Sequence, residues 1–76
     1  MKRFVQEVAN ECLRDLDRLE RFAFATARYY GTLTAESEKE IRKAYAEKRE
    51  KVQATVEQCR YGYISELAAV KIIVEV

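Results

Sequence analysis

The sequence predicts an all-α protein whose 76 residues form one domain, an antiparallel hairpin of two helices over about 2–30 and 35–75. Three observations support this prediction. The composition is 49% hydrophobic and 36% charged with no proline, which is typical of long helices. Apolar residues recur every three or four positions in both segments. Gly31 and a few polar residues separate the segments, and so short a connection makes the helices antiparallel neighbours.

The first segment has no glycine or proline between residues 2 and 30. Its apolar stripe consists of Val5, Val8, Cys12, Leu16, Leu19, Ala23, Ala27 and Tyr30. Gly31 should follow the helix C-cap, because glycine adopts the left-handed conformation without a steric cost from Cβ. Thr34 is the expected N-cap of the second helix, and a capping box of Ser37 with Glu40 is the alternative start.

The second segment has the longer pattern, with spacings of four, three and four residues that repeat from Ile41 to Val74. Lys48 fills the one gap in this stripe, where its stem can lie along apolar surface. An eleven-residue repeat keeps one helix face in register over many turns. We therefore expect one long helix that continues through Gly62 or resumes directly after a kink there, because glycine costs about 1 kcal/mol in a helix interior. Because 70–76 is rich in β-branched residues, a short C-terminal strand is the alternative.

The two stripes share one antiparallel register, because facing residues in a hairpin have position numbers with a nearly constant sum. In this register Ala27 faces Tyr45 and Cys12 faces Cys59. Further along, Val8 and Val5 face Tyr63 and Leu67, and residues 71–76 project beyond the start of the first helix. Ile72, Ile73, Val74 and Val76 would then have no partner in their own chain.

Apolar residues outside the hairpin seam predict self-association. The candidate interface for a second copy or another protein comprises Tyr61, Ile64, Ala68, Ile72, Phe22 and Phe24. Exposed apolar patches of this kind mark interfaces, and small domains without metals or disulfides commonly need oligomerisation for stability. We expect a homodimer in which two hairpins form a coiled-coil-like four-helix bundle.

Charge does not select a partner, since 14 basic and 13 acidic side chains leave a net charge of +1. The most basic region is the start of the second helix, where Arg42, Lys43 and Arg49 form a candidate nucleic-acid-binding patch. Interleaved glutamates offer a structural interpretation, because Glu38 with Arg42 forms a helix-stabilising pair four residues apart. Both interpretations remain open at this stage.

Cys12 and Cys59 form a candidate thiol pair, for which a redox switch or half of a shared metal site is conceivable. Buried free cysteines behave as small hydrophobes, so core packing is the structural alternative. The chain has no histidine, and neither cysteine belongs to a C-x-x-C motif. We expect no metal and no cofactor, and no motif points to an enzyme.

Membrane association is not expected, since the apolar run at 67–76 is about half the length needed to cross a bilayer. The basic residues near the start are not followed by the apolar core of a signal peptide. A cytoplasmic location is the expectation. The sequence thus predicts a small homo-oligomeric helical protein that acts by protein–protein interaction, as adaptor, chaperone or inhibitor. A nucleic-acid-binding accessory protein and a thiol-based module are the alternatives.

Overall fold

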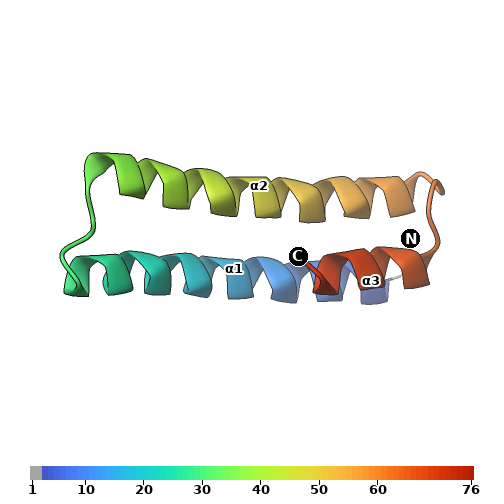
Figure 1. Ribbon diagram of the computed structural model, residues 1–76. Coiled ribbons are helices and arrows are strands. Elements are labelled where there is room, and N and C mark those ends of the chain that lie inside the picture. The colour runs from blue at the N-terminus through green and yellow to red at the C-terminus, as the bar shows by residue number, and fades with distance from the viewer. Residues whose placement is uncertain (1–2) are drawn as a thin grey trace.

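The computed structural model describes residues 3–76, which form three helices joined by two short turns (Figure 1). Helix α1 spans Arg3–Tyr29, α2 spans Ala35–Arg60 and α3 spans Glu66–Val74. Within 3–76 there is no strand, so the all-helical prediction is confirmed and residues 70–74 are helix. Position 2, where the first helix was expected to begin, lies outside the described residues. None of the three helices is both long and apolar enough to cross a membrane.

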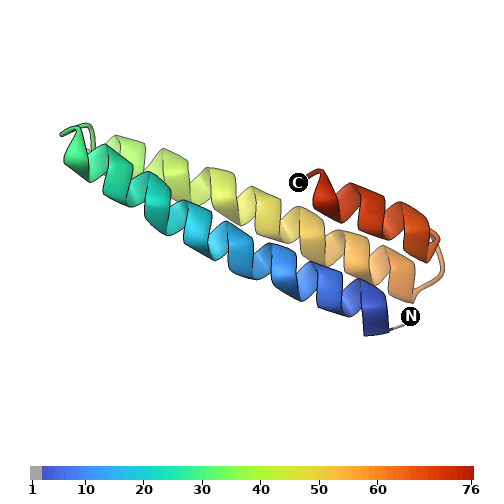
Figure 2. The ribbon, with the colours of Figure 1, turned by 90° about the horizontal axis from the view of Figure 1, so that it is seen from below.

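α1 and α2 form a long antiparallel pair, and the molecule measures 46 × 17 × 14 Å. α3 turns back from the end of α2 and packs against both longer helices. It is nine residues long, so it covers only the half of the hairpin that lies near the N-terminus (Figure 2). The half nearer the turn between α1 and α2 has no third helix.

The turn between α1 and α2 has the predicted chemistry. Gly31 has a φ of 69°, and the Thr32 N–H donates to the Ala27 carbonyl at 2.8 Å, as expected for a left-handed glycine after a helix. Thr34 caps α2: its side chain accepts from the Ser37 N–H at 3.0 Å, and the Ser37 Oγ accepts from the Thr34 N–H at 2.8 Å. Ser37 therefore completes the capping box of Thr34, and the alternative box beginning at Ser37 is not formed.

The prediction of one continuous helix over 35–75 is wrong, because α2 ends at Arg60. Gly62 has a φ of 81°, and the Tyr63 N–H donates to the Gln58 carbonyl at 2.9 Å. These bonds close α2 in the same way as Gly31 closes α1. Ser65 then caps α3, since its side chain accepts from the Ala68 N–H at 3.1 Å. A continuous helix would place both Gly62 and Ser65 in unfavourable interior positions.

The two turns have the same residue pattern: tyrosine, glycine, any residue, an aliphatic residue and a hydroxyl N-cap. It occurs at 30–34 and again at 61–65. The aliphatic residues are Leu33 and Ile64, and both are half-buried. At both turns a left-handed glycine follows one helix and a hydroxyl N-cap begins the next, and the first turn adds the capping box with Ser37.

The core lies where all three helices meet. Its most completely buried large side chains are Val5 of α1, Val52 of α2 and Ile73 of α3. The remaining buried apolar residues are Ala9, Leu16, Val56, Cys59 and Ala69. Thr55 is buried with them, and its hydroxyl donates to the Lys51 carbonyl at 2.8 Å.

The return of α3 corrects the expected register beyond Cys59. Residues 71–76 do not project from the bundle, because Ile73 is fully buried against α1 and α2. Tyr63 and Leu67 do not face Val8 and Val5: they are 79% and 81% exposed. The four-helix bundle expected from the sequence was built on one helix over 35–75, whereas this segment forms the two helices α2 and α3.

Candidate functional site

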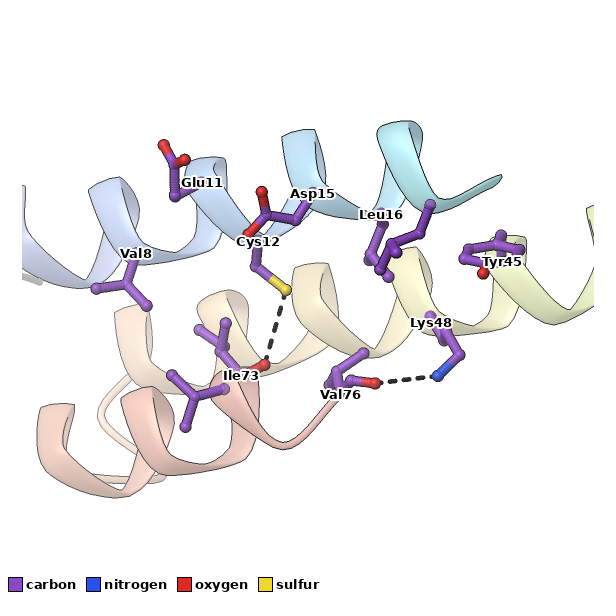
Figure 3. Close-up of a pocket in the computed structure, with 11 residues that line it drawn as sticks. Val8, Glu11, Cys12, Asp15, Leu16, Tyr45, Lys48, Ile73 and Val76 are labelled. Carbon is purple, nitrogen blue, oxygen red and sulfur yellow. Dashed lines mark hydrogen bonds between the residues drawn. The ribbon is translucent and has the colours of Figure 1, made fainter. Parts of the chain in front are cut away.

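An open groove of about 460 Å³ continues along the hairpin from the C-terminal end of α3 (Figure 3). We call it the front groove. Its lining residues are Val8, Glu11, Cys12, Asp15, Leu16, Leu19, Tyr45, Lys48, Ile73, Val74 and Val76. Most of them are apolar, and the two carboxylates of Glu11 and Asp15 lie on α1. All three helices therefore contribute to one apolar concavity with a partly charged edge.

Lys48 fixes the C-terminal end of α3 within this groove. Its ammonium donates to the Val76 carbonyl oxygen at 3.0 Å, and the side chain is half-buried (Figure 3). The sequence placed the aliphatic stem of Lys48 along apolar surface, and its position in the groove agrees with this. The ammonium group, however, binds a backbone carbonyl of the chain. A cation at this position also complements the negative end of the helix dipole.

Two arginine side chains of α2 make their contacts outside the front groove. Arg49 of α2 binds two carboxylates of α1, Asp17 and Glu20, each at 2.8 Å. These hydrogen bonds raise the pKa of Arg49 above its ordinary value, and the bond to Glu20 has a larger effect than the bond to Asp17. Arg42 lies 5.3 Å from the ring centre of Phe24 and also binds Glu38 at 2.7 Å. The predicted pair of Glu38 with Arg42 is confirmed.

The candidate basic patch is thus divided among different contacts. Arg42 and Arg49 contact carboxylates, while the exposed Lys43 has no ion pair within 4 Å among residues 3–76. Arg49 is only 27% exposed in its side chain. Two of the three cations therefore have structural roles, one of which joins α1 to α2.

The two cysteines are free thiols in different settings. Cys59 is buried in the core. Cys12 is half-buried on the wall of the front groove, and its thiol donates to the Ile73 carbonyl of α3 at 3.7 Å (Figure 3). Burial raises the pKa of Cys12, the Asp15 carboxylate raises it further, and the Lys48 ammonium opposes both. Within 3–76 no cluster of three or more potential ligands could hold a metal ion.

The six residues of the candidate interface do not lie on one surface. Ile64 packs against the core, and Ala68 and Ile72 are half-buried. Phe24 is half-buried, and the Arg42 guanidinium lies over its ring. Phe22 and Tyr61 are exposed, but Phe22 is in the later part of α1 whereas Tyr61 follows α2, at the opposite end of the molecule.

Other exposed apolar residues were missed because the sequence register assigned them to the hairpin seam. They are Leu19 on the front groove, Leu67 on α3, Tyr30 at the first turn and Tyr63 at the second. Tyr29 and Tyr30 pack edge-to-face with ring centres 5.0 Å apart, and Tyr61 and Tyr63 lie 6.4 Å apart at the other end. Recognition of Gly62 as a helix end would have moved Leu67 and Tyr63 out of the predicted seam.

Comparisons with protein-family models, curated proteins and solved structures find no match to this chain. The front groove and the exposed apolar side chains are the features of the molecule that bear on its function.

Proposed function

We propose that this chain is a small self-associating helical protein that acts by binding another protein, as adaptor, chaperone or inhibitor, and that it has no catalytic activity. One observation carries the proposal: among the described residues 3–76, nine large apolar or aromatic residues are more than half exposed. They are Phe4, Leu19, Phe22, Tyr29, Tyr30, Tyr61, Tyr63, Leu67 and Val74. Extended apolar surface on a small protein is characteristic of an interface.

The exposed residues suit two kinds of contact. Leu19 and Val74 belong to the apolar front groove, which favours a helix as occupant. The four tyrosines at the two turns combine an apolar ring with a hydroxyl, and tyrosine is enriched in the energetically dominant parts of protein interfaces. A cytoplasmic location is part of the proposal, because two free thiols suit a reducing compartment.

The two alternatives from the sequence have less support. Nucleic-acid binding through the basic patch would require Arg42 and Arg49 to exchange their carboxylate partners for phosphates. A thiol-based module would require reactive thiolate, whereas Cys59 is buried and the pKa of Cys12 is raised. We therefore propose neither as the main function.

Site-specific photocrosslinking tests protein binding. p-Benzoylphenylalanine replaces Tyr30 in one variant and Tyr63 in another, and the chain is irradiated in an extract of its source cells. We expect a discrete product with a different protein from at least one tyrosine position. The matched control carries the probe in place of the exposed Glu47, away from both turns.

The comparison between positions decides the result. Products that require a probe at a turn support recognition by the tyrosines. Products of equal yield from Glu47, or none except the chain linked to itself, would refute binding of another protein through these residues.

A further inference from the structure

α3 is apolar over most of its circumference, and its own hairpin covers only part of this surface. Ala69 and Ile73 are fully buried. A second stripe with three- and four-residue spacing consists of Leu67, Val70 and Val74. Val70 is half-buried against the core, whereas Leu67 and Val74 are 81% and 68% exposed. A helix that is hydrophobic all round is normally buried all round. Leu67 and Val74 of this outer stripe therefore lack a covering layer.

The hairpin also has an uncovered half, and its length matches that of α3. At about 1.5 Å per residue, the nine residues of α3 are roughly 13 Å long. The part of α1 from Leu19 to Tyr29 extends beyond the C-terminal end of α3 and is roughly 16 Å long. Figure 2 shows α3 beside one half of the hairpin and no helix beside the other.

We propose that two copies form a two-fold dimer in which each α3 is sandwiched between its own hairpin and the uncovered half of the partner's hairpin. This inference rests on the proposed self-association and specifies its geometry. The two-fold axis crosses the molecule near the C-terminal end of α3. Each copy then supplies the helix that the other lacks, and the two α3 helices lie end to end between the hairpins.

The size of the exposed surface supports a second copy as the occupant. The chain has an accessible surface of 5728 Å² at a mass of 8.9 kDa. A compact monomer of this mass exposes about 4,800 Å², so the chain has roughly 900 Å² of additional surface. A standard protein interface buries about 800 Å² on each partner. One isologous contact would therefore account for the difference.

The exposed side chains also fit this symmetry. With α3 antiparallel to the partner's α1, Leu67 lies opposite Tyr29 of the partner copy and Val74 lies opposite Phe22 of the partner copy. Both pairs share one register, because their position numbers have the same sum. Val70 lies opposite Thr26 of the partner copy in that register. All four residues of the two outer pairs are large, apolar or aromatic, and more than half exposed in the single chain.

Disulfide trapping tests this geometry. The background chain carries Cys12→Ala and Cys59→Ala, and its fold is checked by circular dichroism. One variant adds Leu67→Cys and a second adds Tyr29→Cys, and the two are mixed under mild oxidation. These positions lie near opposite ends of a molecule 46 Å long, so they meet only between copies. We expect a mixed disulfide dimer of twice the 8.9 kDa chain mass.

Arg28→Cys provides the matched control for Tyr29→Cys. Arg28 is exposed and adjacent in sequence, but it lies about 100° around α1 from Tyr29. We expect its cross-linking with Leu67→Cys to be at least tenfold slower. Equal rates would indicate random collision and would overturn the proposal.

Light scattering on the unmodified chain separates this inference from the proposed function. A dimeric mass without the Leu67–Tyr29 cross-link overturns the sandwich geometry and leaves self-association intact. A monomeric mass at micromolar concentration overturns both. Leu67→Asp gives an independent readout: since Leu67 is exposed in the single chain, the variant should stay helical while its dimer dissociates about tenfold or more readily.

Discussion

Replacement of Gly62 by alanine distinguishes the observed fold from a continuous second helix by the sign of its effect. In an uninterrupted helix, Gly62→Ala would stabilise the protein by about 1 kcal/mol. In the structure Gly62 has a φ of 81°, and a Cβ added there meets no atom within 4 Å. The effect of the substitution on stability therefore comes entirely from the backbone conformation at position 62. An alanine in the left-handed region costs about 1–2 kcal/mol, partly offset by reduced freedom of the unfolded chain.

We expect Gly62→Ala to destabilise the protein by about 1 kcal/mol, which lowers the melting temperature by about 4–8 °C in a domain of this size. Thermal unfolding followed by circular dichroism at one fixed chain concentration measures this change. Gly31→Ala is the internal control, because Gly31 has a φ of 69° and equally open surroundings. Gly62→Asn should lower the melting temperature less than Gly62→Ala, since asparagine tolerates the left-handed conformation better than alanine. A higher melting temperature for Gly62→Ala would refute the helix end at this position.

Three further predictions concern the packing of α3, the link between α1 and α2, and the groove thiol. Ile73→Ala should lower the free energy of unfolding in urea by about 2–4 kcal/mol, because Ile73 is fully buried. Val74→Ala should lower it by less than about 0.5 kcal/mol in the dissociated chain. Equal losses of stability would contradict the orientation of α3. Arg49→Ala should cost about 1 kcal/mol, less at high salt, while Arg14→Ala should leave the midpoint unchanged. With the other cysteine replaced by alanine, Cys12 should react with iodoacetamide more slowly than a free thiol at pH 8, and its rate should rise at higher pH. An alkylation rate and pH profile equal to those of a free thiol would contradict the raised pKa of Cys12. Because the pKa of Cys12 is higher in the folded than in the unfolded chain, the stability that depends on the neutral thiol should be present below about pH 8.5 and lost as pH rises further.

The candidate site could be predicted only in part, and the reason differs between residues. The apolar character of Phe22 and Tyr61 is evident from sequence, but their placement at different ends of the molecule depends on where α2 stops. The pairing of Arg42 with Glu38 is local and was predictable from a four-residue spacing. The binding of Arg49 to Asp17 joins residues 32 positions apart, so no local pattern indicates it.

The sequence by itself determined the helical class, the extent of α1 and the first turn, because these depend on interactions within a few residues. Gly31 and Thr34 exert their effects through adjacent backbone groups. The same chemistry at Gly62 and Ser65 was also present in the sequence, but the eleven-residue periodicity runs across it and suggests a longer helix.

Only the tertiary structure decided which side of α3 enters the core. α3 is apolar over most of its circumference, so periodicity alone cannot distinguish the stripe that contains Ile73 from the stripe that contains Leu67. The choice depends on packing against Val5 and Val52, which belong to two other helices. Burial of the first stripe leaves Leu67 and Val74 exposed, because a single hairpin offers α3 only one surface to pack against.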